Sequence, residues 1–182
     1  LGMIAVVAPE AATLTIDTDA GPKFLTLLDR SGRRFTFRAA MGAPEALTQV
    51  QLDVAGVPVT AITLRVGNPQ CVVLGPATEE RLQSIASALS VHPHFPEGTN
   101  VELAEVLSPG RVRILIWERG VGPTESSGTG TCAAAVAAAA YGSASRIVEV
   151  DAPGGTQTVE WTPDGLWLTG WAELVGRVHW WR

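Results

Sequence analysis

Hydrophobic and polar residues alternate along most of this chain, and the alternation predicts a protein built mainly of short β-strands. Turns that contain Gly, Pro or Ser separate the first three strands, which form a predicted meander. The segment Met41-Gly42-Ala43-Pro44 then interrupts the pattern. The pair Asp164-Gly165 is typical of a tight hairpin near the end of the chain. The predicted strands cover residues 13–16, 24–28, 34–38, 50–54, 59–66, 101–106 and 112–117, with further strands after residue 146.

A change of period after Pro76 predicts a helix. Thr78 is a suitable N-cap because its hydroxyl can accept a hydrogen bond from a first-turn amide. Apolar residues then recur at helical spacings of three and four until the His92-Pro93 pair, where the helix is expected to have ended. These apolar residues are Leu82, Ile85, Ala86 and Leu89.

An alanine-rich stretch from Cys132 to Tyr141 predicts a second helix. The stretch is about half of the roughly 20 residues that a membrane span requires, so a buried helix is expected. Alanine favours helix, and its small side chain lets neighbouring elements approach closely. Gly142 is suited to end this helix.

The turn before this helix combines glycines with hydroxyl residues, and it follows a strand that ends in Glu118-Arg119. Gly128 and Gly130 let the first backbone N–H groups of the helix approach a ligand. These N–H groups lack helical partners and carry the positive end of the helix dipole, so they suit an anion. No Lys follows the glycines and the dinucleotide fingerprint is absent, which favours a carboxylate over a phosphate. A helix that merely crosses a sheet at close range has the same pattern, and this alternative stays open.

Composition narrows the classes of partner. The 182 residues are 46% hydrophobic and carry a net charge of −5, with no run of Lys or Arg, which argues against nucleic acid and anionic membrane surfaces. A small molecule is the expected partner. The apolar segment 1–8 lacks the basic residues of a signal peptide, so a cytoplasmic protein is expected. Cys71 and Cys132, at a predicted strand edge and a helix start, are expected to be reduced thiols.

Two further corners of the chain carry polar groups on constrained backbone. Gly67-Asn68-Pro69-Gln70-Cys71 follows a strand and is interpreted as a tight turn, and the proline-containing segment 92–100 ends in Asn100 just before a strand. Asn in turns usually serves the turn itself. Three such corners in one small chain nevertheless suggest a binding site.

The motifs "GNPQCV", "HPHFPEGTNVELAEV" and "RVRILIWERGVGPTESSGTGTCAAAV", in this order, resemble the carboxy-terminal half of diaminopimelate epimerase. The segments "VDAPGGTQTVEW" and "LTGWAELV" resemble the closing hairpins of that family. The resemblance implies an α/β (α+β) fold, in which a curved, mostly antiparallel sheet wraps around the alanine-rich helix. It also implies that residues 1–42 are the last strands of an amino-terminal domain and that residues 43–182 form the carboxy-terminal domain.

The resemblance implies an isomerase that converts LL- to meso-diaminopimelate, a precursor of lysine and peptidoglycan, with no cofactor and no metal. In that family two cysteines on opposite faces of the substrate exchange the α-proton, because a tuned thiol can act as acid or base near neutral pH. By the same resemblance, Asn68 and Asn100 would hold polar groups of the distal amino acid. Glu118 would hold the amino group, Arg119 a carboxylate, and the Gly128-Thr129 backbone the reacting carboxylate.

Three departures from the family pattern bear on activity. Ser127 stands where the family has its second catalytic cysteine, and an unassisted hydroxyl is too weak an acid for this proton transfer. Cys132 lies about one turn further on and is expected to point into packing. The motif that carries the family's first catalytic cysteine belongs to the amino-terminal domain, and this sequence does not contain it. Pro123 and Gln70 stand where the family has Glu and commonly His. The chain alone is therefore expected to be inactive.

Three functional readings stay open at this point. The chain is an epimerase whose other half is a separate chain or has been lost, a catalytically dead amino-acid-binding or assembly domain, or a variant of the hydroxyproline-dehydratase type that also needs another half. In a fourth reading the motifs persist only as fold determinants. The expected partner chain is a second copy, which would bury part of residues 1–40, or a separate amino-terminal half. Four tryptophans are predicted to form either a docking patch or core: Trp167, Trp171, Trp180 and Trp181.

Overall fold

The computed structural model describes residues 13–18 and 21–176, and it has the mixed α and β architecture that the sequence predicts. The chain divides into two compact units. The described residues up to Ala40 and from Thr169 onward form the first unit, and Met41–Leu168 form the second unit. The division falls inside two strands, β3 (Arg34–Gly42) and β12 (Gly165–Glu173). The domain boundaries that the resemblance implies stay a prediction.

The first unit is the predicted meander. Strands β1 (Thr13–Thr18) and β2 (Gly21–Ser31) pair antiparallel, and β2 pairs antiparallel with β3. Its small core consists of Leu14, Leu25, Phe35 and Phe37. Trp171 is 45% exposed, and the Arg34 guanidinium lies 4.2 Å from the centre of one of its rings. Trp180 and Trp181 lie outside the described residues, so the docking patch stays a prediction.

The sheet of the second unit has the strand order β12-β11-β10-β8-β7-β6-β5-β4, and β9 adds to β8. Most of its pairs are antiparallel, whereas β6 with β7 and β8 with β10 are parallel. The strand bounds are β4 Glu45–Val54, β5 Val57–Val66, β6 Asn68–Leu74, β7 Asn100–Ser108, β8 Arg111–Glu118, β9 Gly122–Thr124, β10 Ile147–Ala152 and β11 Gly155–Thr162.

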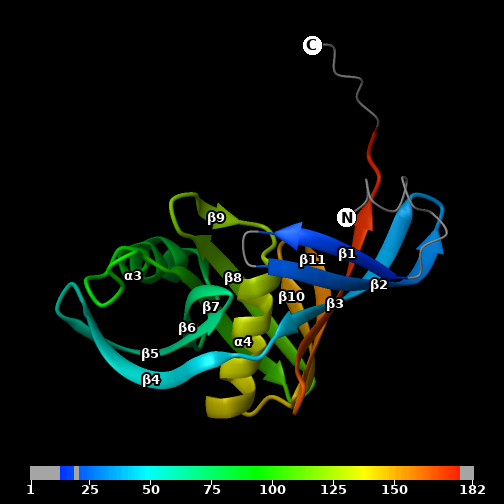
Figure 1. Ribbon diagram of the computed structural model, residues 1–182. Helices are drawn as coiled ribbons and strands as arrows, with labels where there is room; N and C mark the ends of the chain where they lie inside the picture. Colours follow the sequence, from blue (N-terminus) through cyan, green and yellow to red (C-terminus); the bar gives the residue numbers. More distant parts are fainter. Residues whose placement is uncertain (1–12, 19–20, 177–182) are drawn as a thin grey trace. The chain divides into compact units, whose positions relative to one another are not determined.

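Helix α4 (Gly128–Tyr141) is the predicted alanine helix, and the sheet of the second unit curves around it (Figure 1). It contacts β5, β6, β7, β8, β10 and β11. Every residue from Gly130 to Ala138 is buried, as expected for a helix that is apolar on all sides. Because alanine adds only a methyl group, strands can approach the helix axis from several directions. Gly142 caps its end and donates its N–H to the Ala138 carbonyl, which confirms the prediction.

The other face of this sheet is covered by a short helical segment. It begins with α2 (Glu79–Arg81), continues as a π-helical turn, η1 (Leu82–Ala86), and ends with α3 (Ser87–Ser90). The Thr78 hydroxyl accepts a hydrogen bond from the Arg81 amide at 3.4 Å, so the predicted N-cap and helix are confirmed. The predicted apolar residues Leu82, Ala86 and Leu89 are buried in a core on this face.

One predicted turn is wrong. Asn68 opens strand β6 and pairs directly with Val66 of β5, so only Gly67 lies between the two strands. Gly67 has a φ of 77°, a left-handed conformation that glycine adopts without a steric penalty. The reversal is therefore made by a single residue, and the Asn68 side chain belongs to a strand with a defined facing direction.

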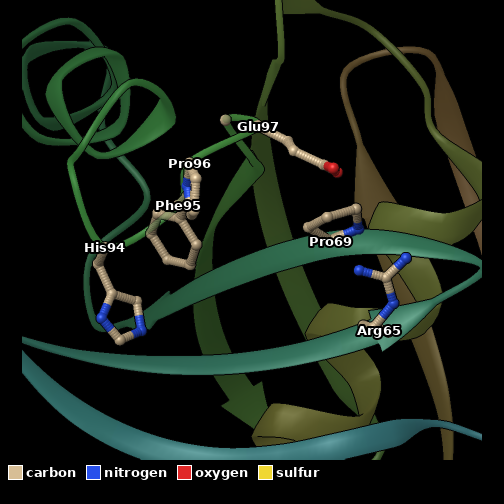
Figure 2. Close-up of a pocket in the computed structure, with 7 residues that line it drawn as sticks. Arg65, Pro69, His94, Phe95, Pro96 and Glu97 are labelled. Carbon is tan, nitrogen blue, oxygen red and sulfur yellow. The ribbon is translucent and has the colours of Figure 1, made fainter.

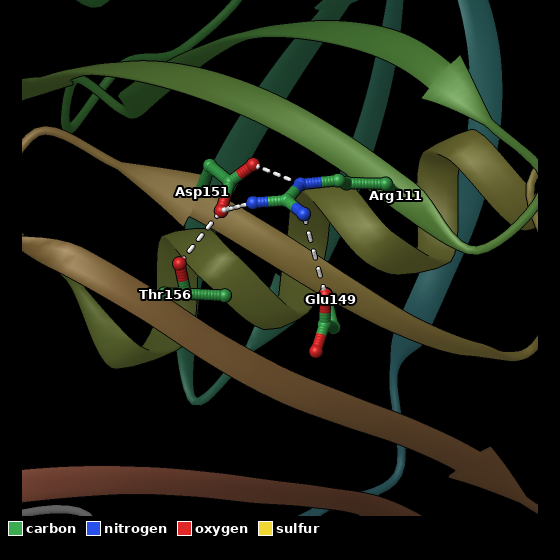
Figure 3. Close-up of polar contacts among 4 residues, drawn as sticks. All are labelled: Arg111, Glu149, Asp151 and Thr156. Carbon is green, nitrogen blue, oxygen red and sulfur yellow. Dashed lines mark hydrogen bonds and ion pairs between the residues drawn. The ribbon is translucent and has the colours of Figure 1, made fainter.

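An ion-pair cluster secures the parallel pairing of β8 and β10. The Arg111 guanidinium donates two hydrogen bonds to the Asp151 carboxylate, at 2.6 and 3.1 Å, and lies 3.7 Å from Glu149 (Figure 3). Thr156 of β11 donates to the same carboxylate at 2.7 Å. The Arg111 hydrogen bonds lower the pKa of Asp151 below its usual range. The cluster thus joins β8, β10 and β11 on the face of the sheet opposite α4, because Val112, Val148 and Val150 face the helix.

Within the described residues, no helix has the length and hydropathy needed to cross a membrane.

Candidate functional site

Ser127 is the N-cap of α4. Its backbone is extended, its hydroxyl accepts a hydrogen bond from the Gly130 amide at 3.2 Å, and its carbonyl accepts one from Thr131 at 2.9 Å. No described residue accepts a hydrogen bond from the backbone N–H of Gly128 or Thr129. These two N–H groups therefore remain available to a ligand at the positive end of the helix dipole. We call the backbone of Ser127, Gly128, Thr129 and Gly130 the glycine turn.

The β10–β11 hairpin holds the approach to the glycine turn in place. The Gly154 amide, in the β10–β11 turn, donates to the Glu125 carbonyl at 2.8 Å. One turn into the helix, the Thr131 hydroxyl donates to the Gln157 side chain of β11 at 2.8 Å. Two hydrogen bonds to one hairpin thus fix the start of α4 before any ligand binds, which lowers the conformational cost of binding.

Packing also restricts the two glycines. A Cβ atom on Gly128 would lie 3.2 Å from the Leu168 side chain and 3.8 Å from that of Met41. A Cβ atom on Gly130 would lie 2.5 Å from Oε1 of Glu102, a distance that real Cβ atoms do not adopt. Close packing therefore explains the glycine at 130 without a ligand, whereas Gly128 has room for a methyl group with a small adjustment.

The two predicted asparagines lie on neighbouring parallel strands. Asn68 Oδ1 accepts a hydrogen bond from Gln70 Nε2 at 2.6 Å, and Asn100 Oδ1 accepts one from the backbone N–H of Arg119 at 3.0 Å. Gln70 pairs in register with Asn100 across the β6–β7 ladder. No described residue accepts a hydrogen bond from the side-chain amide nitrogen of either asparagine. Both donors can therefore serve a ligand.

The predicted residues on β6, β7 and β8 face α4. Side chains two residues apart on a strand share one face of the sheet. Val72, Ala104 and Ile116 belong to the core around α4, and they share their faces with Asn68, Asn100 and Glu118 respectively. The structure thus brings the three polar residues to the same side of the sheet as the glycine turn.

Arg119 lies just beyond β8, and the loop between α3 and β7 holds its side chain. Its Nη1 donates to the Glu97 carbonyl at 2.5 Å, and its Cδ packs so closely on Gly98 that a Cβ there would lie 2.8 Å away. Gly98 also has a φ of 71°, which glycine tolerates. Arg119 is exposed, so the rest of its guanidinium remains available for a carboxylate.

The sequence prediction missed Glu102, the most unusual side chain of the region. It lies on β7, is 0% exposed, and neither of its carboxylate oxygens has a hydrogen-bond partner among the described residues. Burial raises its pKa to about 8, and the charge of Glu118 adds to the effect. Alternation in the sequence contained the signal, because Glu102 shares a strand face with Asn100 and Ala104. Its complete burial depends on the packing of Gly130, which the alternation alone does not reveal.

A cavity of about 390 Å³ lies elsewhere on the second unit, between β5–β6 and the loop before β7 (Figure 2). Arg65, Pro69 and the segment His94 to Gly98 line it. Leu64 and Val66 face α4, so Arg65 between them points to the other face of the sheet. The cavity is therefore not part of the glycine turn. No group of three His, Cys, Asp or Glu side chains suited to a metal ion occurs in the described part of the chain.

The family model named diaminopimelate epimerase matches residues 62–179, which contain the glycine turn and its three flanking strands. The chain belongs to this family. A diaminopimelate epimerase from Desulforudis audaxviator is 46% identical over 127 residues, which cover 68% of this chain and 45% of that protein. Another, from Synechococcus elongatus, is 33% identical over 176 residues, covering 96% of this chain and 60% of that protein. The chain thus spans about half of the first relative and three fifths of the second.

Solved structures of related fold agree with the architecture. A hydroxyproline epimerase from Agrobacterium vitis, with bound trans-4-hydroxy-L-proline, superposes with a TM-score of 0.65 at 17% identity, covering 89% of this chain and 58% of that one. A probable proline racemase from Agrobacterium radiobacter, with bound carbonate, gives a TM-score of 0.65 at 18% identity, covering 90% and 60%. At these identities the likeness shows the fold.

The two cysteines of this diaminopimelate epimerase family member are poor acid–base groups. Both are free and 0% exposed. Burial raises the pKa of Cys132 to about 12 and that of Cys71 still further above its ordinary value. Cys132 packs in the core around α4, as predicted. A thiol of such high pKa supplies almost no thiolate near neutral pH, so neither can abstract an α-proton there.

Proposed function

We propose that this chain supplies one half of an amino-acid epimerase active site and binds a diamino dicarboxylate such as LL-diaminopimelate. The proposal rests on the N–H groups of Gly128 and Thr129 at the start of a buried helix, which have no partner among the described residues. A carboxylate is the complementary group, because it accepts both hydrogen bonds and is attracted by the helix dipole. Family membership supports an amino acid as the ligand.

The surrounding side chains complement the rest of such a ligand. Glu118 offers a carboxylate to an ammonium group, and the side-chain amides of Asn68 and Asn100 offer donors to a second carboxylate. Arg119, fixed on its loop by the Glu97 carbonyl, offers part of its guanidinium.

The helix dipole contributes about 0.3 to 1 kcal/mol when exposed and up to about 2 kcal/mol when partly buried. We expect a dissociation constant near 1 mM, or about 4 kcal/mol of binding free energy.

Binding by this chain is expected without turnover. Inversion of an α-carbon requires a base on one face and an acid on the other. The residue at the family's second catalytic position is Ser127, and its hydroxyl caps the helix. Both thiols are buried. Neither the capped Ser127 hydroxyl nor the two buried thiols of the described chain can therefore remove the α-proton.

A matched pair of substitutions at Gly128 tests the proposal. Gly128→Pro removes one N–H donor from the glycine turn, and proline is tolerated at the first position of a helix after an extended residue such as Ser127. Gly128→Ala keeps the N–H and adds the same Cβ contact with Leu168. We expect Gly128→Pro to weaken LL-diaminopimelate binding by about tenfold, the loss of one charge-assisted hydrogen bond. Gly128→Ala should bind within about twofold of the unchanged chain.

Calorimetry or ligand-detected NMR measures both affinities, and circular dichroism confirms that each variant folds. Equal affinity of the two variants would show that this N–H does not bind the ligand. The glycine turn would then be a feature of folding only, as its close packing at Gly130 already permits.

A further inference from the structure

Glu102 is a buried acid that the proposed function does not use. Its carboxyl group lies against the first turn of α4, because a Cβ on Gly130 would lie 2.5 Å from Glu102 Oε1 and 3.2 Å from the Ser127 hydroxyl. Glu102 and the hydroxyl of the helix cap thus both lie close to the same point beside Gly130. Both oxygens of Glu102 lack a partner among the described residues, although the side chain is 0% exposed.

A buried carboxyl group without a partner is much more stable as the neutral acid than as the anion. On the α4 face of the sheet, the neighbouring strands present Glu118 on β8 and only the neutral Asn68 and Gln70 on β6. No cation on this face compensates a charge on Glu102 among the described residues. The carboxyl group therefore holds a proton directly beneath the glycine turn.

We propose that Glu102 is a positioning residue that controls carboxylate binding at the glycine turn, so that the turn binds a carboxylate only while Glu102 is protonated. A neutral Glu102 leaves the first-turn N–H groups and the helix dipole electropositive. An ionised Glu102 places a negative charge beneath the same N–H groups and repels the ligand through a medium of low dielectric. This inference rests on the proposed function, because it concerns the same carboxylate.

The pH range of the effect follows from the pKa of Glu102, which burial raises to about 8. Carboxylate binding should be intact below about pH 7 and should weaken as the pH rises through 8. Two other titratable groups on neighbouring elements are the thiols Cys71 of β6 and Cys132 of α4. Burial raises the pKa of Cys132 to about 12 and that of Cys71 further, so neither ionises in this range. Glu118 also acts on Glu102, by raising its pKa.

Pimelate is the most suitable probe, because it has two carboxylates and no ammonium group that would titrate in the same range. The affinity of the chain for pimelate is measured from the backbone amide shifts of Gly128 and Thr129, in titrations at several pH values between about 6.5 and about 9.5. The dissociation constant of the unchanged chain should rise about tenfold at one pH unit above the pKa of Glu102. In Glu102→Gln, which keeps the volume and cannot ionise, the affinity should be independent of pH. Glu149→Gln, an exposed control on β10 whose side chain points away from α4, should retain the rise.

Reciprocity supplies a measurement on the unchanged chain, which is decisive even if Glu102→Gln does not fold. Saturating pimelate must raise the pKa of Glu102, as followed by the carbon shift of its carboxyl group. An affinity that does not change with pH, or a pKa that pimelate does not move, would overturn the role of Glu102. Absence of any shift at Gly128 and Thr129 at about pH 6.5 would instead overturn the proposed function.

Discussion

At the scale of single residues, the pairing of Glu102 with Gly130 is the contact that sequence patterns do not reveal. Alternation along β7 shows that Glu102 faces the same way as Asn100, but a Glu on a strand is usually solvated. Only the close approach of α4, permitted by the missing side chain of Gly130, buries it completely. The glycines were interpreted from the sequence as a ligand cradle, and one of them also accommodates a buried acid.

The burial of Glu102 predicts that the stability of the protein depends on pH. In the unfolded chain a Glu has a pKa of about 4.3, whereas in the folded chain its pKa is about 8. Between these values only the folded state holds the proton, so the free energy of unfolding falls as the pH rises and levels off above about pH 8. The fall attributable to Glu102 is at most about 5 kcal/mol.

Urea unfolding at a series of pH values measures this effect, and Glu102→Gln should remove most of the slope between about pH 5 and about pH 8. Glu149→Gln serves again as the control, because its carboxylate is exposed and makes only a 3.7 Å ion pair. A slope that is the same in Glu102→Gln and in the unchanged chain would mean that Glu102 ionises normally in the folded protein.

At the scale of elements, α4 and its cap determine what the site can do. The alanines made the helix predictable, since a run of small apolar residues has few other stable arrangements in a soluble core. Strand β6 was not predicted, because Asn68 to Cys71 were interpreted as part of a turn, whereas the strand already begins at Asn68. That difference arises from Gly67, whose left-handed backbone completes the reversal by itself.

Ser127→Cys tests whether the cap residue alone limits catalysis. A thiol is a weaker hydrogen-bond acceptor than a hydroxyl, so the loss of the bond to the Gly130 amide should lower the free energy of unfolding by about 1 kcal/mol. The variant should still show no exchange of the α-proton of LL-diaminopimelate in deuterated water, because one acid–base group serves only one face. Proton NMR measures the exchange and urea unfolding the stability. Exchange well above the solvent background would contradict the requirement for a second group.

At the scale of the whole molecule, both helices, the family and most strands were predictable from local pattern and motif order, whereas β6 and β9 were not predicted. The polar partners within the site were not. The side-chain carbonyl of Asn100 accepts a hydrogen bond from the backbone N–H of Arg119, and Nη1 of Arg119 donates one to the Glu97 carbonyl. Such contacts join residues about 20 positions apart and depend on strand register, which alternation specifies only up to a shift of two residues.

Backbone amide shifts during a titration with LL-diaminopimelate test most directly whether the start of α4 binds a carboxylate. The titration is done at about pH 6.5, because Glu102 is then protonated. We predict saturable shifts at Gly128 and Thr129, accompanied by shifts at Asn100 and Glu118, with a dissociation constant near 1 mM. Shifts confined to other parts of the chain, with Gly128 and Thr129 unmoved at saturation, would contradict the claim.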